Sequence, residues 1–399
     1  MTRHKRWLPV LPFLVAAGAL LVWSPAAASG PDDHGTRHED GRPEGDHHGE
    51  EGHHVTAAAA VPPLQRPAII SQRATHSVLL AATRAGQRIV VTGERGIVLL
   101  SDDGAKTWRQ AKVPVSVTLT AVQFPSEKVG YAVGHFGVVL RTDDGGESWA
   151  LLLDGTRAAK LADDSAKALA AQKPADAALQ QLVAATTRLV ADGPDKPFLD
   201  LHFDSENAGN VIGAYGLVFR TEDGGKSWTS WMDRIENPKG NHLYALREVR
   251  GALYLAGEQG LFLRSDDRGQ TWKRLATPYN GSFFTAASYP DGTLVLAGLR
   301  GNAFATSDQG KTWRKIEGPP VNITALAEAG DRLLATNFAG MVLEIPNGSP
   351  GVKPLPIPPL PPLTNLLPSR DGSLLVLSLQ GAIPLPAPGA AAPNQAGGH

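Results

Sequence analysis

Short apolar runs alternate with polar turns along most of the chain, and this alternation repeats with a period near forty residues. In each copy, two apolar runs precede a Gly-x-x-Gly turn and a third follows it, as around Gly257–Gly260. The second glycine of the turn recurs at Gly96, Gly137, Gly216, Gly260 and Gly301. Two weaker copies, Asn337–Gly340 and Ser378–Gly381, keep the spacing, and the seven positions lie at intervals of 41, 79, 44, 41, 39 and 41 residues. Several short strands in each period of about forty residues predict an all-β fold, the β-propeller.

The pattern predicts seven blades within residues 66–386. Once the one large interruption is set aside, seven blades share these residues at about 40 each, as the period requires. The innermost strands are expected at Val78–Ala81, Thr120–Phe124, Leu199–Phe203, Tyr244–Val249, Phe284–Ser288, Ile323–Ala327 and Thr364–Pro368. Blade seven lacks a clear fourth strand after Ile383. We expect Ala68–Arg73 to complete it, because pairing the two ends of the ring removes a free sheet edge.

Five copies carry an eight-residue ending, Ser/Thr-x-Asp-x-Gly-x-Ser/Thr-Trp, after the third apolar run. The Asp and the Ser/Thr can accept backbone N–H groups across a tight turn, the Gly permits a positive φ, and the Trp packs between blades. We interpret these residues as structural. The Asp and Trp positions are Asp103 and Trp108, Asp144 and Trp149, Asp223 and Trp228, Asp267 and Trp272, and Asp308 and Trp313. In the first copy Ala105 replaces the Gly, which predicts a slightly strained turn.

Gly155–Asp195 is the large interruption, and it accounts for the interval of 79 residues. It is rich in Ala, Leu, Lys and Asp and is broken by Pro174. Apolar residues between Leu179 and Val190 recur at helical spacing, so we expect a helical hairpin over about 157–172 and 175–192. The proline-rich stretch Pro346–Pro362 is expected to be an extended connection that carries the weak outer strand of blade six.

The two ends of the chain have the composition of targeting and tail segments. Residues 1–28 combine a basic start, an apolar core and a small-residue end, which is typical of a cleaved secretory signal; an uncleaved membrane anchor is the alternative. Residues 29–65 and 387–399 contain too few apolar groups to offset the entropy of ordering, so both are predicted to be disordered tails. The mature protein is therefore expected in the periplasm.

Six of the 12 histidines lie in the leader at 29–65, beside many Asp and Glu residues. Neutral imidazoles in such a setting can bind zinc, copper or nickel loosely, with His47, His48, His53 and His54 as candidates. No spacing here resembles a closed four-ligand site, so a solvated linker is the first interpretation and weak metal binding the alternative. The chain has no cysteine, which excludes disulfides and thiolate chemistry, and no cofactor is predicted.

The order of strands within a blade decides which loops share a face of the propeller. The Gly-x-x-Gly turns and the connections between blades fall on one face, and the Asp-containing endings fall on the other. The helical insertion joins two blades, so it belongs to the first face, near its rim or over its mouth. Insertions gathered on one face suggest that this face meets a partner.

The turns of that face present a mixture of aromatic, arginine and amide side chains, which is typical of binding hot spots. The candidate partner-binding residues are Arg95, His135, Phe136, Tyr215, Glu258, Gln259, Arg300 and Phe338, and neighbouring connections add His242, Asn280, Phe283 and Asn322. Ordinary solvated turn residues are the alternative interpretation for each position. A net charge of −1 argues against a nucleic-acid partner, and we expect a monomer.

The five endings resemble the Asp boxes of sialidase-type repeats, and that resemblance raises the question of glycoside hydrolysis. Sialidases require an arginine triad, a Tyr nucleophile with a Glu partner and an Asp acid/base. Here the candidate face offers only Arg95 and Arg300 with Tyr215 and two Glu residues, Glu94 and Glu258, and no Arg-Ile-Pro motif exists. The sequence therefore predicts a protein that is not an enzyme, with a carbohydrate-binding or sialidase-like glycosidase propeller as the alternative.

A closer resemblance is to the photosystem II stability/assembly factor family. It rests on the segments GHFGVVLRTDDGGESW (134–149), GAYGLVFRTEDGGKSW (213–228) and GEQGLFLRSDDRGQTW (257–272) and extends over about 66–385. The resemblance implies a seven-bladed, non-catalytic propeller outside the cytoplasm, with an arginine patch that receives membrane-protein assembly intermediates. Only Arg95 and Arg300 occupy matching turns, so this patch is depleted here. The expected function is a scaffold that binds a membrane-protein complex and supports its assembly or stability.

Overall fold

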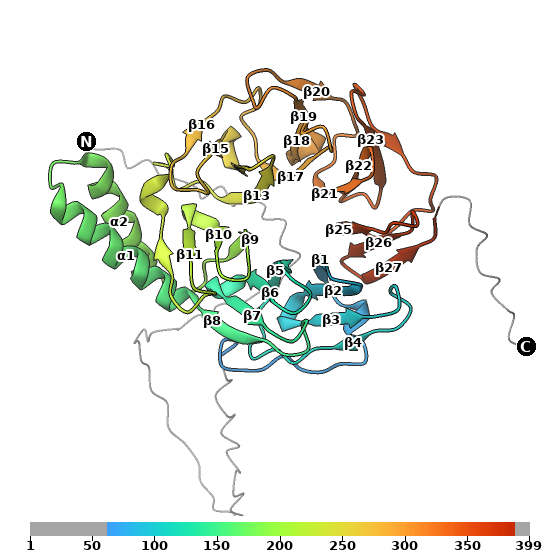
Figure 1. Ribbon diagram of the computed structural model, residues 1–399, viewed down its shortest axis with the longest axis horizontal. Helices are drawn as coiled ribbons and strands as arrows, with labels where there is room; N and C mark the ends of the chain where they lie inside the picture. Colours follow the sequence, from blue (N-terminus) through green and yellow to red (C-terminus); the bar gives the residue numbers. More distant parts are fainter. Residues whose placement is uncertain (1–61, 388–399) are drawn as a thin grey trace, which may run out of the picture.

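Residues 62–387 are described by a computed structural model of the protein, and they form a ring of seven β-sheets (Figure 1). Six of these sheets have four strands and one has three. The all-β, seven-bladed prediction with one helical hairpin is therefore confirmed. The predicted signal segment, nearly all of the His-rich leader with its four candidate metal ligands, and residues 388–399 of the tail lie outside the described residues.

The strands follow one another from the centre of the ring to its rim in every blade. Blades one to three contain β1 (Leu79–Ala85), β2 (Arg88–Gly93), β3 (Val98–Ser101) and β4 (Arg109–Gln110); β5 (Leu119–Gln123), β6 (Gly130–Gly134), β7 (Val139–Thr142) and β8 (Ala150–Leu153); and β9 (Phe198–Phe203), β10 (Gly209–Gly213), β11 (Val218–Thr221) and β12 (Thr229–Ser230). Blades four and five contain β13 (Leu243–Val249), β14 (Ala252–Gly257), β15 (Phe262–Ser265) and β16 (Lys273–Arg274), and β17 (Phe283–Ser288), β18 (Leu294–Gly298), β19 (Ala303–Thr306) and β20 (Arg314–Ile316). Blades six and seven contain β21 (Ile323–Ala329), β22 (Arg332–Asn337), β23 (Val342–Pro346) and β24 (Lys353–Pro354), and β25 (Leu363–Pro368), β26 (Leu374–Ser378) and β27 (Gly381–Leu385).

Both glycines of the repeated Gly-x-x-Gly turn are required because neighbouring backbone passes very close to them. A β-carbon at the first glycine of blade two, Gly134, would lie 2.1 Å from the carbonyl oxygen of Thr118. At the second glycine of blade five, Gly301, φ is +71° and a β-carbon would lie 2.0 Å from the carbonyl oxygen of Pro319. The turn is thus pressed against the connection that links the blades, and only glycine fits at either position.

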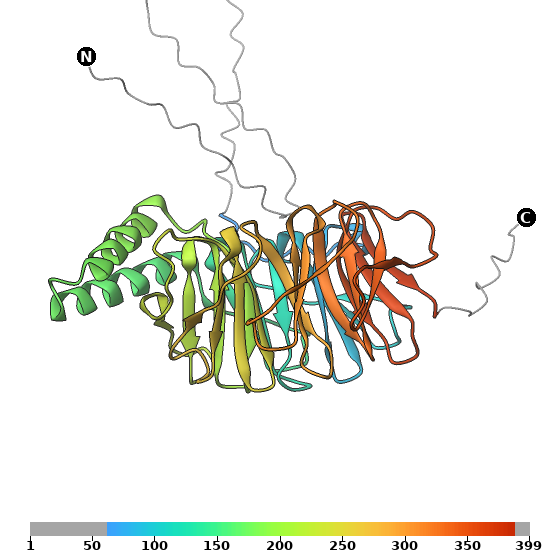
Figure 2. The same ribbon diagram turned by 90° about the horizontal axis from the view of Figure 1, so that it is seen from above.

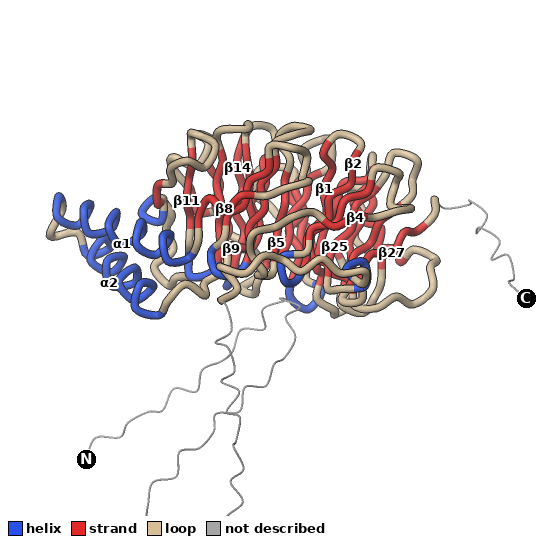
Figure 3. The backbone as a smooth tube through the Cα atoms, turned by 90° about the horizontal axis from the view of Figure 1, so that it is seen from below, coloured by secondary structure: helices blue, strands red, loops and turns tan. Residues whose placement is uncertain are grey.

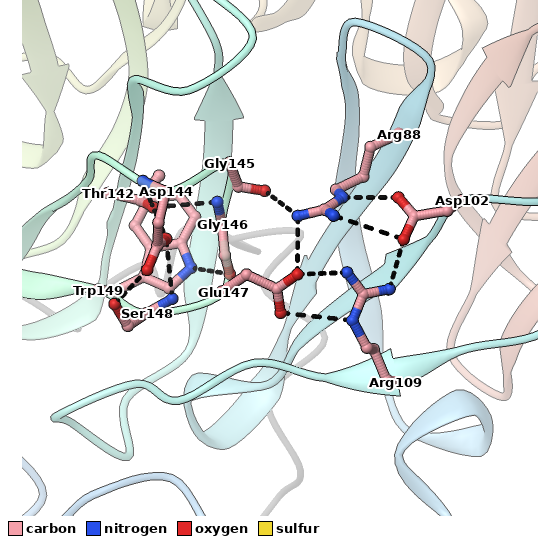
Figure 4. Close-up of polar contacts among 10 residues, drawn as sticks. All are labelled: Arg88, Asp102, Arg109, Thr142, Asp144, Gly145, Gly146, Glu147, Ser148 and Trp149. Carbon is pink, nitrogen blue, oxygen red and sulfur yellow. Dashed lines mark hydrogen bonds and ion pairs between the residues drawn. The ribbon is translucent and has the colours of Figure 1, made fainter.

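The Asp-box turn of blade two illustrates how the repeated ending closes the outer hairpin (Figure 4). The Thr142 hydroxyl accepts the N–H of Gly146 at 3.0 Å, and the Asp144 carboxylate accepts the N–H of Ser148 at 3.0 Å and the Ser148 hydroxyl. The Trp149 indole N–H donates to the carbonyl oxygen of Gly146 at 3.0 Å. These bonds satisfy the polar groups of a tight turn and bury the tryptophan between blades.

The prediction that Ala68–Arg73 completes blade seven is wrong, because this segment forms no strand and blade seven keeps three. The segment instead lies along blade one, where Gln110 accepts the N–H of Ser71 and donates to the carbonyl oxygen of Ile69. Inner-strand contacts close the ring: Thr364 Oγ1 donates to the carbonyl oxygen of Leu79 at 2.5 Å. A local partner for the segment and inner-strand closure together make the shared strand unnecessary.

The insertion is a helical hairpin that projects outward from the rim beside blades two and three, away from the central mouth (Figure 1). Its helices are α1 (Gly155–Gln172) and α2 (Ala177–Asp192), each with an aspartate N-cap, Asp154 or Asp176, whose carboxylate accepts two backbone N–H groups. Small buried residues of α1 such as Ala158 join the core of blades two and three. Within residues 62–387, neither helix is long and apolar enough to cross a membrane.

Candidate partner-binding face

The two faces of the ring differ in what they carry. One face, the Gly-x-x-Gly face, holds the turns η2 (Glu94–Gly96), η3 (His135–Gly137), η4 (Ala214–Gly216), η6 (Glu258–Gly260) and η7 (Leu299–Gly301). The first described residues lie on this face, and the helical hairpin is connected to the ring on the same face (Figures 2 and 3). The opposite face, the Asp-box face, holds the five Asp-box turns. The structure thus gathers the elements that depart from the plain repeat on one side of the ring.

Five blades present a side chain on the Gly-x-x-Gly face from the same backbone conformation. The residue before the second glycine has a left-handed φ of 53° at Arg95, 58° at Phe136, 56° at Tyr215, 52° at Gln259 and 55° at Arg300. A non-glycine residue in this region is uncommon and carries a conformational cost. The repeat of this conformation means that five blades present a side chain to the same face in the same geometry.

Four aromatic rings form a continuous row from this face to the central channel. Tyr215 lies 4.9 Å from His242, His242 lies 6.3 Å from Tyr244, and Tyr244 meets Phe284 edge-on at 5.3 Å, all between ring centroids. Tyr244 and Phe284 also line the channel cavity. We call Tyr215, His242, Tyr244 and Phe284 the aromatic row. Such a row offers apolar and π surface to a bound segment.

Glu258 fixes the middle of the aromatic row. Its carboxylate accepts the N–H of His242 at 2.9 Å and the hydroxyl of Tyr244 at 3.2 Å. Burial lowers the pKa of His242, although the nearby Glu258 charge opposes that shift. The N–H of Tyr215 points at His242 Nδ1 at 3.3 Å, which fits a neutral imidazole that accepts at this nitrogen. Burial also raises the pKa of Tyr244, so its hydroxyl stays protonated and donates.

Two lysines flank the exposed end of the row. Lys196 Nζ lies 5.7 Å from the centroid of the Tyr215 ring, and Lys239 Nζ donates to Gln259 Oε1 at 3.2 Å. The sequence-predicted residues Tyr215, Glu258 and Gln259 are therefore brought into one neighbourhood. Lys196 is paired with Asp195 and is only 12% exposed, so the exposed positive charge beside the Tyr215 ring comes from Lys239. An exposed aromatic ring beside a lysine suits an apolar segment that carries a carboxylate.

The other predicted residues are distributed around the ring and differ in exposure. The side chain of Arg95 is 77% exposed and lies 3.9 Å from Glu94, and Arg300 is also exposed. Phe136 and Phe338 are half-buried, and Phe136 packs against the core of blades one and two. Burial lowers the pKa of His135, whose Nε2 has no hydrogen-bond partner. These residues do not join the aromatic row.

One predicted connection residue, Phe283, does not face the partner-binding side. Phe283, expected on the Gly-x-x-Gly face, is fully buried in the core of blades four and five. Phe284 follows it on the same strand and points to the channel, because successive side chains of a strand alternate between faces. Tyr244 was likewise missed as a site residue, although its place at the start of an inner strand could have identified it.

Exposed apolar side chains mark the same face. Four large hydrophobic residues are exposed among residues 62–387: Ile69 at 73%, Ile70 at 63%, Val190 at 48% and Tyr215 at 48%. Ile69 and Ile70 follow Ala68, which packs against the second glycine of η2, and Val190 lies on the inserted helix α2. All four thus belong to the Gly-x-x-Gly face or to the insertion joined to it. Ile69 and Ile70 are adjacent and form one exposed apolar pair, whereas Val190 and Tyr215 are exposed singly.

The central channel adds a cavity of about 600 Å³ lined by the inner strands. Its polar groups are largely committed to contacts between blades. Asp200 accepts the N–H of Leu246 at 2.9 Å and pairs with Arg247 at 2.5 Å, and Thr120 donates to the carbonyl oxygen of Phe198 at 2.8 Å. Side chains that are already paired across blades favour a structural role for the channel wall.

Comparison with known proteins gives a consistent assignment. The family model described as "Photosynthesis system II assembly factor YCF48" matches residues 183–321. The photosystem II assembly lipoprotein Ycf48 of Synechococcus sp. (strain CC9902) is 29% identical over 77 residues, which cover 19% of this chain. The match spans only 23% of that relative's own length.

Solved structures match over the whole ring at low identity, and so they support the fold. A structure described as YCF48 bound to D1 peptide has a TM-score of 0.58 at 16% identity and covers 83% of this chain and 98% of its own. YCF48 from Cyanidioschyzon merolae gives 0.56 at 15%, covering 79% and 96%. The WD40 propeller domain of Doa1 gives 0.55 at 12%, covering 81% and 96%. The resemblance inferred from the Asp-box segments is thus confirmed over residues 183–321, and the solved structures support the seven-bladed β-propeller fold.

Proposed function

We propose that this protein is a non-enzymatic scaffold that binds an exposed segment of a membrane-protein complex through its Gly-x-x-Gly face and supports the assembly or stability of that complex. The observation that carries the proposal is the aromatic row, whose outer ring, Tyr215, is 48% exposed on that face. Burying such surface against a partner is favourable by about 25 cal/mol per Å².

The bound segment is proposed to be an extended peptide that reaches Tyr215 and continues toward the channel mouth. The aromatic row supplies its apolar contacts, while the exposed Lys239 supplies positive charge beside it. One structural neighbour, YCF48, is described as bound to D1 peptide, which supports a peptide as the kind of ligand. Work in the periplasm, at the outer surface of the inner membrane, follows from the predicted signal segment.

The test is co-purification of the tagged mature protein from its native membranes, with bound proteins identified by mass spectrometry. Tyr215→Asn removes the exposed ring yet suits the left-handed conformation at this position, because Asn tolerates it better than most residues. The matched control is Arg268→Asn, which changes an exposed left-handed residue (φ 58°) on the Asp-box face. A membrane-protein subunit should be recovered with the wild type and with Arg268→Asn, and reduced about tenfold or more with Tyr215→Asn.

Two results would contradict the proposal. One is the absence of any membrane-protein subunit from all three preparations. The other is equal recovery with Tyr215→Asn and loss with Arg268→Asn, which would place the contact on the Asp-box face. A double variant, Ile69→Ser with Ile70→Ser, extends the test to the second exposed apolar patch, where recovery should also fall.

A further inference from the structure

A histidine and two carboxylates meet between blades three and four at the Asp-box face, on the side of the ring away from the proposed partner. His202 and Asp204 lie at the end of β9, and Glu248 lies near the end of β13. His202 Nε2 is 3.1 Å from Glu248 Oε2 and 3.3 Å from Asp204 Oδ1. All three atoms lie within 4.8 Å of one another.

The two separations from His202 Nε2 suit ligands of one small cation. Two ligands bound about 2.0–2.1 Å from a tetrahedral zinc ion lie about 3.3 Å apart. One imidazole nitrogen with two carboxylate oxygens is also a donor set that zinc and related divalent metals accept, leaving a fourth position for water. The His202 and Asp204 side chains are only 15% and 17% exposed, whereas Glu248 is 45% exposed and leaves a path for a cation to enter.

A buried polar side chain without a partner neighbours His202 in the sheet. Asn210 on β10 is 1% exposed, and neither its Oδ1 nor its Nδ2 has a hydrogen-bond partner. It lies directly opposite His202 on one side and Arg220 on the other in the sheet register. Directly opposed residues place their side chains on the same face of a sheet. A buried amide without a partner is costly, and water coordinated to a metal beside His202 would supply one.

The surrounding charges are arranged around Asp204. Arg220 Nη1 donates to Asp204 Oδ2 at 2.8 Å, while Asp204 Oδ1 faces His202. The same arginine donates through Nε to Glu222 at 2.7 Å, so its positive charge is balanced by a carboxylate outside the ligand set. Hydrogen bonds that hold the free oxygen of a ligating carboxylate are a usual feature of metal sites.

We propose that His202, Asp204 and Glu248 bind a divalent transition metal of the zinc class. Asn210 and Arg220 lie behind these ligands and hold them in position. The ligands come from two neighbouring inner strands, so the bound ion links blade three to blade four. The site is structural and independent of the partner-binding face.

The test is cobalt and zinc titration of the full mature chain, because tetrahedral Co²⁺ gives an intense visible absorption. The leader histidines contribute an equal background to every variant. The wild type should show one more equivalent of bound Co²⁺, with the tetrahedral spectrum, than His202→Ala or Glu248→Gln. The matched control His76→Ala removes an exposed histidine far from any carboxylate partner and should behave as the wild type. Saturating Zn²⁺ should raise the Tm of the wild type by about 2–4 °C and leave that of Glu248→Gln unchanged.

Equal stoichiometry and spectra in the wild type, His202→Ala and Glu248→Gln would overturn the proposal and assign all binding to the leader. A Tm that zinc raises equally in the wild type and Glu248→Gln would do the same. If His202→Ala fails to fold, Glu248→Gln still tests the site, because the Glu248 side chain is partly exposed and the change is conservative. Asn210→Ala should weaken the affinity by about 10–100-fold, as expected of a residue behind the ligands.

Discussion

Blade two and blade seven are held to blade one in different ways. Blade two is joined near the rim, where Arg109 bridges Asp102 of blade one and Glu147 of blade two, and Arg88 contacts both carboxylates (Figure 4). Backbone bonds add to this seam: the N–H of Lys112 donates to the carbonyl oxygen of Glu147 at 3.0 Å. Blade seven has no Asp box and no fourth strand.

Blade seven is joined to blade one at the inner strands and along its central turn. Thr364 and Asn365 donate to the carbonyl oxygens of Leu79 and Leu80, at 2.5 and 3.0 Å. Arg84 adds a bond to the Ser369 hydroxyl at 2.8 Å. Leu375 and Leu377 of blade seven also share a buried apolar cluster with Val91 and other residues of blade one. The difference teaches that inner-strand contacts and this shared core close the propeller without a fourth strand, while the Asp boxes hold the outer strands of the other blades. We therefore expect the seam between blades one and seven to open first.

Trp149→Ala should cause the largest loss of unfolding free energy, because it removes the outer packing of blade two. The tryptophan is 6% exposed and meets Phe124 edge-on at 6.0 Å. Removing a large buried aromatic side chain costs about 3–5 kcal/mol of unfolding free energy. Urea unfolding followed by circular dichroism measures this loss. A cost below about 1 kcal/mol would show that the inner strands alone hold blade two.

Thr364→Val should weaken the closing seam by about 1–3 kcal/mol, since it leaves the buried carbonyl oxygen of Leu79 without its donor. The matched variant is Thr120→Val, which removes the equivalent bond to Phe198 where blade two meets blade three. Hydrogen exchange read by mass spectrometry should show faster exchange in β1 and β25 for Thr364→Val. An equal or larger local effect for Thr120→Val would contradict the view that the closing seam is the weaker one.

The fold was largely predictable because the pattern of apolar runs and glycine turns recurs in every blade. Buried middle strands such as Leu294–Gly298 are continuous apolar runs, and their period sets the blade count. The closing strand was not predictable from such a pattern. Whether Ala68–Arg73 pairs with blade seven depends on single residues. Gln110 holds this segment on blade one through Ile69 and Ser71, and Pro384 removes one N–H from β27.

Acid should weaken the Asp boxes at a pH set by their carboxylates. Hydrogen bonds from the Ser227 side chain and backbone hold the pKa of Asp223 at about 2, below the ordinary value of 3.8. A depressed folded pKa means that the stabilisation is present in full above about pH 4 and is lost as the pH falls through about 2. The difference in unfolding free energy between wild type and Asp223→Asn should therefore shrink over this range.

Blade seven supplies the matched measurement for this pH dependence. There, Asp371 accepts only from its near neighbour Ser373, through the N–H at 3.0 Å and the hydroxyl at 2.6 Å. Asp371→Asn should cost less than Asp223→Asn at about pH 7, because no Asp-box turn depends on it. A cost for Asp223→Asn that stays constant from about pH 7 to pH 2 would exclude the carboxylate charge as the cause.

The candidate sites were predictable only where they follow the repeat. Tyr215 and Glu258 occupy the Gly-x-x-Gly turn, so the period located them. His202 and Glu248 lie in no motif and come from different blades, 46 residues apart in the chain. Their meeting depends on how adjacent inner strands pack, which a pattern within one blade does not contain.

Ala105→Gly should give the smallest effect and the opposite sign, because the first Asp box alone carries a β-carbon at the position that is glycine in the other four. Ala105 has a φ of 71°, whereas Gly146 and Gly225 occupy the same position with φ of 93° and 86°. Relief of about 1–2 kcal/mol of conformational cost exceeds the entropic cost of glycine, about 0.5–1 kcal/mol, so unfolding free energy should rise by a few tenths to about 1 kcal/mol. The control is Ala111→Gly, at a buried alanine outside the left-handed region, which should lower stability instead. A loss in both variants would mean that the buried Ala105 methyl packs well enough to outweigh its backbone strain.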